Sequence, residues 1–424
     1  MERNRQIIYQ LAPRTFTPEG TLKAAAALLP HVADLGVDIV YLCPVFVAEN
    51  DPDEATWSPR QKASATNNPK NPYKMADYFN VDPEYGTNED LKAFVASAHA
   101  LGLKVLFDLV YLHCGRGAVF LKDHPDFIER NEDGSDVIGE RWPFARLNYK
   151  NPDLRAYLAK NVEYLIREFD VDGFRCDVGD RVPLDFWESV FCPIKERNPD
   201  FITLNEGRDP AYLAKAFDWG YGFEWASTMR HIFRGEEKAS ALRARWEEEK
   251  KLYGEATCRL LRSIDNHDTA SDIGLLRNEV VMTSRGVEAA LVVTNTFEGI
   301  AFLWNGYELC DNAENNMFSN RDHGRRSAMN WSRAFTAEGR RRMEIVRKLH
   351  ELHHANNGSL EWLENDLPDD VISYRCGVSV VVNTRNTPVT VRVDGDFTAP
   401  ILQSGAAIEN GTVTLEPYGY IIAK

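Results

Sequence analysis

The ten residues VDGFRCDVGD, at positions 171–180, join a short apolar run to an arginine and three aspartates. The run follows a helical pattern and reads as a β-strand. Side chains alternate along a strand, so Arg175 and Asp177 share one face while Phe174 and Cys176 share the other. An arginine and a carboxylate at the end of a buried strand indicate either a structural salt bridge or a reactive site.

Similar apolar, β-branched runs recur along the chain, and helical patterns such as residues 88–102 and 152–169 lie between them. The eight strand candidates are residues 6–13, 37–45, 103–111, 171–178, 200–207, 217–225, 259–268 and 299–306. Eight alternating strand–helix units predict an α/β fold in which a closed parallel (β/α)8 barrel forms. A doubly wound open sheet is the alternative that the pattern leaves open.

Two segments depart from this alternation. A long polar stretch, residues 114–151, separates the third strand from its helix and predicts an insert that forms a lid or a small subdomain. After residue 357 the apolar residues alternate with period two between turns, which predicts a small antiparallel β domain over residues 358–424. The barrel is accordingly expected over residues 1–113 and 152–357.

Composition limits the partners and the compartment. The chain has 424 residues, 44% of them hydrophobic, with a net charge of −15, which argues against nucleic acid or an anionic membrane as partner. It contains no run of eighteen apolar residues that would predict a membrane span. Seven cysteines, an odd number without a CxxC pair, indicate free thiols and a cytoplasmic location. A secretory signal trimmed from this sequence stays an open alternative.

The predicted strands end in polar residues. Asp108 and His113 lie at the third strand, Glu206 ends the fifth, and His267 and Asp268 end the seventh. In a parallel barrel these ends meet at the face where active sites form. Burying so many charged groups without partners would cost too much, so the sequence predicts chemistry at this end of the barrel.

These motifs resemble those of the α-amylase family of glycoside hydrolases. YKMADYFNVDPEYGTNEDLKAFVASAHALGLKVLFDLVYLHCG (residues 73–115) resembles the third-strand region of the family. DGFRCDV (172–178) resembles its nucleophile motif, LNEGRD (204–209) the segment that carries its acid, and IDNHDT (264–269) its last catalytic motif. Four such motifs in the family's order make the resemblance specific, and it covers nearly the whole chain.

The resemblance implies roles for the residues at matching positions. Asp177 would be the nucleophile, Glu206 the general acid and base, and Asp268 the residue that holds sugar hydroxyls. His113 and His267 would bind the sugar at the cleavage point, and Tyr73 would stack on it. Arg175 would keep Asp177 ionised, while Asp108 would orient Arg175 and Asp77 would be structural. The weaker candidates are Trp57, Trp142 and Phe144 as sugar platforms and Arg325 and Arg326 as substrate contacts.

Departures from the family pattern affect the expected metal content. An asparagine that often binds calcium in the family is replaced here by Leu112, and Asp180 and Arg181 replace a frequent Lys-His pair. The acidic calcium loop that some members have after the first strand is missing from TFTPEGTL (15–22). The sequence therefore predicts an enzyme without a metal ion or other cofactor.

The resemblance implies a retaining hydrolase that acts on α-glucans or maltooligosaccharides through a covalent glycosyl–enzyme intermediate. Two alternatives stay open: a transglycosylase such as a glucanotransferase, and an inactive family member that only binds sugar. Val178 occurs in relatives that cut α-1,6 bonds and in cyclomaltodextrinase-like ones, so the linkage preference stays open. Chain-length preference, endo or exo action and oligomeric state are open as well.

Overall fold

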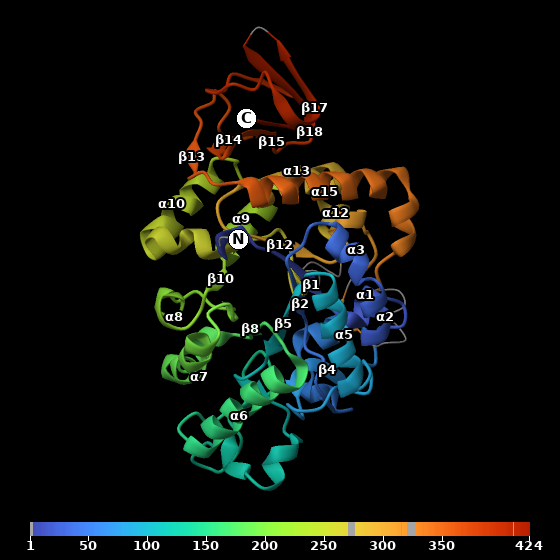
Figure 1. Ribbon diagram of the computed structural model, residues 1–424, viewed down its shortest axis with the longest axis vertical. Coiled ribbons are helices and arrows are strands. Elements are labelled where there is room, and N and C mark those ends of the chain that lie inside the picture. Colours follow the sequence, from blue (N-terminus) through green and yellow to red (C-terminus); the bar gives the residue numbers. More distant parts are fainter. Residues whose placement is uncertain (1–2, 270–275, 315, 320–327, 410) are drawn as a thin grey trace.

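The structure, a computed structural model, describes residues 3–269, 276–314, 316–319, 328–409 and 411–424. Eight parallel strands close into a barrel in the ring order β1-β12-β11-β10-β9-β8-β5-β2 (Figure 1). Their bounds are β1 Ile7–Leu11, β2 Ile39–Leu42, β5 Lys104–Leu109, β8 Gly173–Cys176, β9 Ile202–Asn205, β10 Trp219–Tyr221, β11 Leu260–Arg262 and β12 Ile300–Trp304. The predicted barrel is confirmed, and each of the eight predicted strands contains one of these.

Helices cover the outside of the barrel. They are α1 Pro13–Phe16, α2 Leu22–Ala27, α3 Leu29–Asp34, α5 Asn88–Ala100, α6 Pro152–Phe169, α7 Leu184–Arg197, α8 Pro210–Lys215, α9 Phe223–Phe233, α10 Ala241–Tyr253, α12 Asn278–Val281, α13 Thr283–Thr296 and α15 Ala337–Ala355. Helix α6 buries Leu154, Leu158, Val162 and Leu165, which recur every three or four residues on one face. The Asn151 side chain caps this helix by accepting a hydrogen bond from the Asp153 amide. These features hold α6 against the strands that carry the polar residues.

Short elements that are not part of the barrel lie between its strands. The segment after β2 contains β3 (Ala48–Asn50), helix α4 (Pro59–Ala63) and β4 (Lys70–Met75), and β3 pairs with β4. The segment after β5 contains β6 (His113–Cys114) and β7 (Ala145–Arg146), which pair with each other. These segments carry Tyr73 and His113, so they bring side chains to the mouth of the barrel from outside its strands.

The C-terminal region forms an antiparallel sheet in the order β13-β14-β15-β18-β16, with β17 paired to β18. The bounds are β13 Glu361–Trp362, β14 Val371–Cys376, β15 Val378–Asn383, β16 Val389–Val391, β17 Pro400–Glu409 and β18 Thr412–Ala423. Tyr374 of β14 packs against Phe297 and hydrogen-bonds Thr296 at the end of α13 (2.6 Å between hydroxyl oxygens). Figure 1 shows this sheet at one end of the long axis and the segment after β5 at the other.

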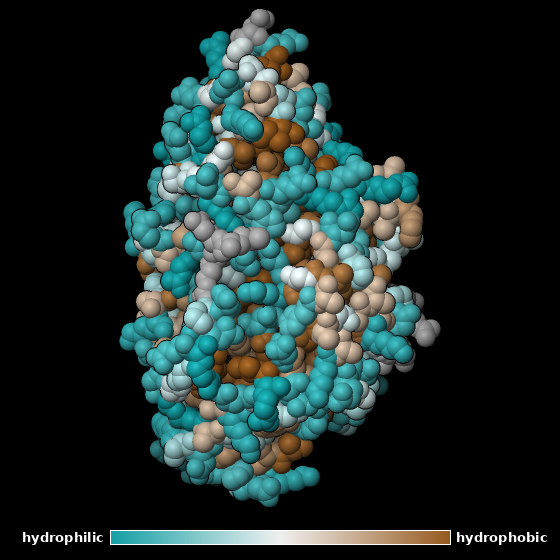
Figure 2. Space-filling view, viewed as in Figure 1, coloured by the Kyte–Doolittle hydropathy of each residue, from teal (hydrophilic) through white to brown (hydrophobic). Residues whose placement is uncertain are grey.

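The surface and the thiols agree with the composition. Hydrophilic side chains cover most of the face in Figure 2, and its hydrophobic patches are small and separate. None of the helices that the structure describes is long and apolar enough to cross a membrane. All seven cysteines fall within the described residues, and each is a free thiol.

Candidate active site

Arg175 is the centre of the polar cluster at the carboxyl ends of the strands. Its side chain is fully buried, and one guanidinium nitrogen, Nη1, donates to both oxygens of Asp108 (2.9 Å each) and to Asp177 Oδ1 (3.0 Å). The other nitrogen, Nη2, forms an ion pair with Glu206 Oε2 at 2.8 Å. The expected contact between Asp108 and Arg175 is confirmed, and a single cation binds three carboxylates.

The register of the barrel explains this convergence. Asp108 on β5 is paired with Arg175 on β8, and Cys176 is paired with Asn205 on β9. Asp177 and Glu206 each follow one of these last two residues, so they leave neighbouring strands at the same level. Adjacent parallel strands therefore place the two carboxylates side by side over the barrel.

The backbone after Asp177 orients Glu206. Val178 has φ 43° and ψ 43°, a left-handed conformation that a β-branched residue rarely adopts. In this conformation its amide donates to Glu206 Oε2 at 2.8 Å. Since both Arg175 and the Val178 amide bind Oε2, a proton on Glu206 would be carried by Oε1. Such strain at a site is typical of a functional constraint.

The carboxyl groups of this cluster have shifted pKa values. Burial raises the pKa of Asp177 well above its usual range, and the nearby charge of Glu206 raises it further. Burial also raises the pKa of Glu206, while Arg175 lowers it. Arg175 lowers the pKa of Asp177, as expected, but burial and Glu206 together raise it by more. Arg175 alone therefore does not keep Asp177 ionised. With one guanidinium for three carboxylates, the charge of each carboxylate disfavours ionisation of its neighbours.

A hydrogen-bond chain joins Gln10, His267, Tyr73 and Asp108. The His267 amide donates to Gln10 Oε1 (3.2 Å), so the Gln10 Nε2 group donates to His267 Nδ1 (2.6 Å). Burial lowers the pKa of His267 to about 3, so its ring is neutral and carries its proton on Nε2. That nitrogen lies 2.7 Å from the Tyr73 hydroxyl, which donates to Asp108 Oδ2 at 2.9 Å. The chain fixes the tautomer of His267.

The other predicted site residues lie around this chain. The Tyr73 and His267 rings are stacked, with centroids 5.3 Å apart. His113 Nε2 lies 2.9 Å from the Tyr73 carbonyl oxygen, and burial lowers the pKa of His113 to about 4. Asp268 bonds to Arg60 and lies beside His267. The structure thus brings all seven predicted site residues into one connected region.

The structure indicates packing or structural roles for two of the aromatic candidates and for Asp77. Trp57 is only 4% exposed and its indole donates to the Asp51 carbonyl (2.8 Å), which favours packing within its own loop over the expected platform role. Phe144 is buried against His113, which favours packing over sugar binding. Asp77 accepts hydrogen bonds from Phe79 and Asn80, a structural role as expected. Arg325 and Arg326 lie outside the described residues.

Sequence reasoning missed Gln10 and Arg60. Gln10 is a polar residue inside the otherwise apolar strand β1, and that exception was its only signal. Arg60 lies in helix α4, between Ser58 and Gln61, which form a capping box. Its guanidinium donates to Asp268 Oδ1 at 2.5 Å, although the two residues are 208 positions apart. Burial alone would raise the pKa of Asp268, but Arg60, His267 and Arg175 together lower it.

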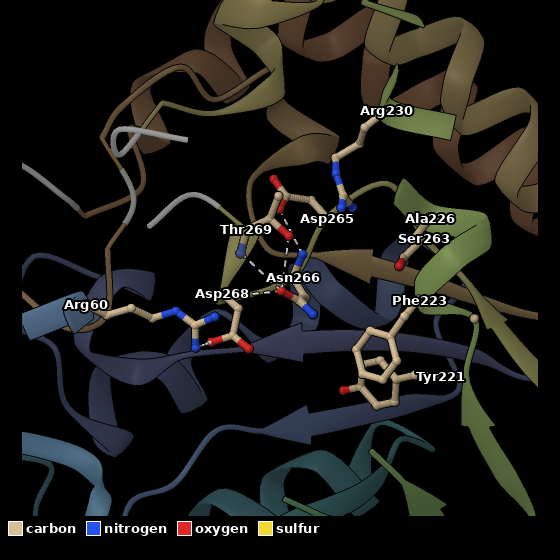
Figure 3. A pocket seen from close by; sticks show the side chains of 11 residues that line it. Arg60, Tyr221, Phe223, Ala226, Arg230, Ser263, Asp265, Asn266, Asp268 and Thr269 are labelled. Atoms are coloured by element: carbon tan, nitrogen blue, oxygen red, sulfur yellow. Dashed lines mark hydrogen bonds and ion pairs between the residues drawn. The ribbon is translucent and has the colours of Figure 1, made fainter. Parts of the chain in front are cut away.

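Arg60 and Asp268 line a pocket of about 160 Å³ at the mouth of the barrel (Figure 3). The stacked rings of Tyr221 and Phe223, whose centroids are 4.9 Å apart, line its other side. Asp265 and Asn266 form part of its wall from the end of β11. The pocket combines carboxylates, a guanidinium and aromatic faces, which are the groups that bind and cleave sugars.

The residues at the family's calcium position do not fit a cation. Leu112 is buried and has no side-chain oxygen, and its backbone carbonyl accepts from the Leu147 amide (3.2 Å). The acidic stretch 131–136 is an exposed turn, and its Asp136 is bound by Arg116 and Arg130. Within the described ranges, no three His, Cys, Asp or Glu side chains are arranged to hold a metal.

We expect activity to be independent of calcium. Treating the protein with a chelator, removing the chelator by dialysis and measuring both turnover and melting temperature should show no change, because arginine and leucine occupy the positions that would need oxygen ligands. A loss of turnover or of melting temperature that calcium restores would contradict this prediction.

Comparison with known proteins agrees with the geometry. The family model for the catalytic domain of alpha amylase matches residues 4–133 and 142–353, more than half of the chain. A cyclomaltodextrinase from a Bacillus species is 27% identical over 383 residues, which cover 77% of this chain and 62% of that protein. An intracellular maltogenic amylase from Bacillus subtilis is 24% identical over 379 residues, covering 84% of this chain and 59% of the relative.

The chain thus spans about three fifths of the length of these curated relatives. Among solved structures, a noncanonic maltogenic alpha-amylase from Thermotoga neapolitana superposes with a TM-score of 0.81. It is 23% identical and the match covers 100% of both chains, which shows a shared fold. The family model, the closed barrel and the residues at its mouth lead to one conclusion: this chain belongs to the alpha-amylase family.

Proposed function

We propose that this protein is a retaining glycoside hydrolase that cleaves α-glucosidic bonds in α-glucans or maltooligosaccharides. The observation that carries the proposal is the pair formed by Asp177 and Glu206, which end neighbouring strands and bind the same guanidinium. Retaining glycosidases need two carboxyl groups only about 5–5.5 Å apart, one to attack and one to protonate the leaving oxygen. A shared arginine is consistent with such a short spacing.

In the proposed mechanism, Asp177 attacks the anomeric carbon while Glu206 gives its proton to the leaving oxygen. A covalent glycosyl–enzyme ester results, and water activated by Glu206 then hydrolyses it with net retention of configuration. Asp268 would bind sugar hydroxyls through Oδ2, because its contacts with Arg60 and His267 both involve Oδ1. The neutral rings of His113 and His267 and the face of Tyr73 would position the sugar.

The test is a screen of nitrophenyl glucosides, maltotriose, isomaltose, cyclodextrin and soluble starch, with the anomer of the first product read by NMR. Turnover with the α-anomer formed first supports the proposal. An inverted product, or no turnover of any of these substrates, would contradict it. The same screen separates the enzyme from an inactive member of the family that only binds sugar.

Transglycosylation is the second candidate. A second pocket, of about 170 Å³, shares Tyr221, Gly222 and Phe223 with the first and extends toward Leu252 and Tyr253. The aromatic and aliphatic faces of this second pocket could bind an acceptor sugar in place of water. Product analysis at high maltotriose concentration separates the two: longer oligosaccharides indicate transfer, and glucose or maltose alone indicates hydrolysis.

The pH profile of kcat/KM should have its acidic limb well above pH 4. Turnover needs ionised Asp177, and burial raises the pKa of this group above the usual value of about 3.9. Glu206 must be protonated, and its raised pKa moves the alkaline limb upward as well. Initial rates on a nitrophenyl glucoside from pH 4 to pH 9 test this. A maximum at or below pH 4 would contradict it.

For the chain as a whole, we propose a barrel over residues 1–113 and 152–357, an insert over 114–151 and a C-terminal β domain over 358–424. A cytoplasmic location is proposed from the seven free thiols and from the name of the intracellular relative. The net charge of −15 supports the absence of nucleic acid as a partner.

A further inference from the structure

Helix α4 holds Arg60 in a defined position beside the active site. The Ser58 hydroxyl and the Gln61 amide cap the helix, and Asn71 Nδ2 donates to both of these side chains (3.0 and 3.1 Å). Asn71 lies on β4 two residues before Tyr73, so the same strand positions the helix and the tyrosine. The backbone that carries Arg60 is therefore fixed relative to the active site.

The Arg60 side chain packs against two neighbouring aromatic rings. Its guanidinium lies 5.0 Å from the centroid of Trp142 and 5.7 Å from that of Phe318, and only 15% of the side chain is exposed. The two rings lie 6.2 Å apart, and Phe318 also lies 6.1 Å from Tyr73. These three residues, Arg60, Trp142 and Phe318, contact one another in a cluster in which Phe318 is fully buried, and we name this cluster the Arg60 wall.

The position of Phe318 in the wall is fixed by buried contacts. Its backbone carbonyl accepts a hydrogen bond from Asn68. Arg14, which is buried, donates to the carbonyl of Met317 at 2.8 Å and forms an ion pair with Glu84 (2.6 Å). The wall is thus supported by side chains from the segment between β3 and β4 and from the start of the barrel.

The topology of the barrel places Arg60 and Phe318, two of the three residues of the Arg60 wall, on the far side of the mouth from Glu206. In the ring order, β1 lies four strands from β9 in either direction, and β2 and β12 flank β1. Arg60 follows β2 and Phe318 follows β12, whereas Glu206 follows β9. Because Glu206 protonates the leaving oxygen, the leaving group lies on its side of the mouth, and the sugar that is transferred lies toward the wall.

The open space begins at Arg60 and Asp268 and extends away from them. Both pockets, of about 160 and 170 Å³, are lined by Tyr221 and Phe223, which follow β10 next to β9. The second pocket extends from there toward Arg208 and α10. The open space thus ends at Arg60, which contacts Asp268, and continues on the other side past Tyr221.

We propose that Arg60 determines specificity by closing the donor end of the site and binding the terminal hydroxyls of a non-reducing sugar. The protein then attacks α-glucan chains at their non-reducing ends. This inference rests on the proposed function and adds to it the mode of attack. A guanidinium with several N–H donors suits a chain end, where free hydroxyls accept hydrogen bonds that an interior glycosidic link does not offer.

The test compares two substrates that differ only at the chain end. One is chloronitrophenyl maltotrioside, and the other is the same compound with its non-reducing 4- and 6-hydroxyls blocked as an ethylidene acetal. The wild-type protein is expected to turn over the blocked compound at least about 100-fold more slowly in kcat/KM, since the block meets Arg60 and removes its hydrogen-bond partners.

Arg60→Ala should reduce this ratio to about tenfold or less, because it removes both the obstacle and the donor. Trp142→Ala, which removes another part of the wall, should shift the ratio in the same direction and serves if Arg60→Ala does not fold. Arg130→Ala removes an exposed arginine that pairs with Asp136 and should leave the ratio unchanged. Circular dichroism and melting temperature establish that each variant is folded.

Equal turnover of both substrates by the wild-type protein would overturn the inference while leaving the proposed function intact. A large ratio that folded, active Arg60→Ala retains would overturn the role of Arg60. If the wild-type protein turns over neither compound nor any substrate of the screen above, the proposed function fails first, and the inference fails with it.

Discussion

Asp177→Asn is expected to lower kcat on any α-glucoside by about 10⁴-fold or more, while the protein stays folded. An amide cannot form the glycosyl ester, so the covalent route is lost. The fold should persist because the substitution keeps the shape of the side chain. It also removes one of the three carboxylates around Arg175 and leaves Asp108 and Glu206 to bind the guanidinium.

The measurement is kcat on a nitrophenyl glucoside together with melting temperature. Asp180→Asn is the matched control, because Asp180 is a nearby aspartate in the same segment, whose carboxylate accepts from the Arg208 amide (2.9 Å). It should keep most of the wild-type activity. Wild-type kcat in a folded Asp177→Asn variant would contradict the assignment of the nucleophile.

Glu206→Gln is expected to lower turnover by about 10²- to 10⁴-fold on substrates with poor leaving groups, such as maltotriose. The loss in the glycosylation step should be much smaller on an aryl glucoside whose leaving group needs little protonation. Glutamine still accepts the hydrogen bond from the Val178 amide, so the strained backbone after Asp177 should not change. The variant loses the transferable proton and also the carboxylate that pairs with Arg175 and later acts as base.

This prediction is tested by pre-steady-state and steady-state rates on maltotriose and on dinitrophenyl glucoside. The burst of phenol release reports glycosylation, and the later rate reports hydrolysis of the intermediate, in which Glu206 acts as base. Added azide should speed the second step in the variant, because a small anion needs no general base. Equal losses in glycosylation on both substrates would contradict the role of Glu206 as the acid.

The barrel could be predicted from sequence because each strand is a short apolar run between helical patterns. The residues at which the strands end could not be predicted in this way. The run at 217–225 reads as one strand, yet β10 ends at Tyr221 and helix α9 begins at Phe223. Likewise β11 covers only Leu260–Arg262, because the polar residues that follow turn into the mouth of the barrel. Apolar content alone does not separate a strand from the helix or turn that follows it.

The centre of the candidate site was also accessible from sequence, because its carboxylates and histidines lie at the ends of predicted strands. Arg60 was not accessible in this way. Its partner Asp268 is 208 residues away, and the segment that carries Arg60 lies outside the strand–helix alternation. Trp57 shows the converse case: a tryptophan in a polar loop suggests a sugar platform, but here its indole fills the core of that loop.

The raised pKa of Asp177 could not be predicted from the sequence either. Sequence reasoning placed an arginine next to the aspartate and inferred an ionised group. The depth of burial and the presence of Glu206 on the same guanidinium became visible only in three dimensions, and both act against ionisation.

The proposed mechanism requires Asp177 to form a covalent bond with the sugar. The most direct measurement incubates the wild-type protein with 5-fluoro-α-glucosyl fluoride, which forms the ester quickly and releases it slowly, and then locates the label by peptide mass spectrometry. We expect one fluoroglucosyl group per chain, on the peptide that contains Asp177, and no label in Asp177→Asn. A label on Glu206 or Asp268, or an unlabelled protein that still turns over the reagent, would contradict it.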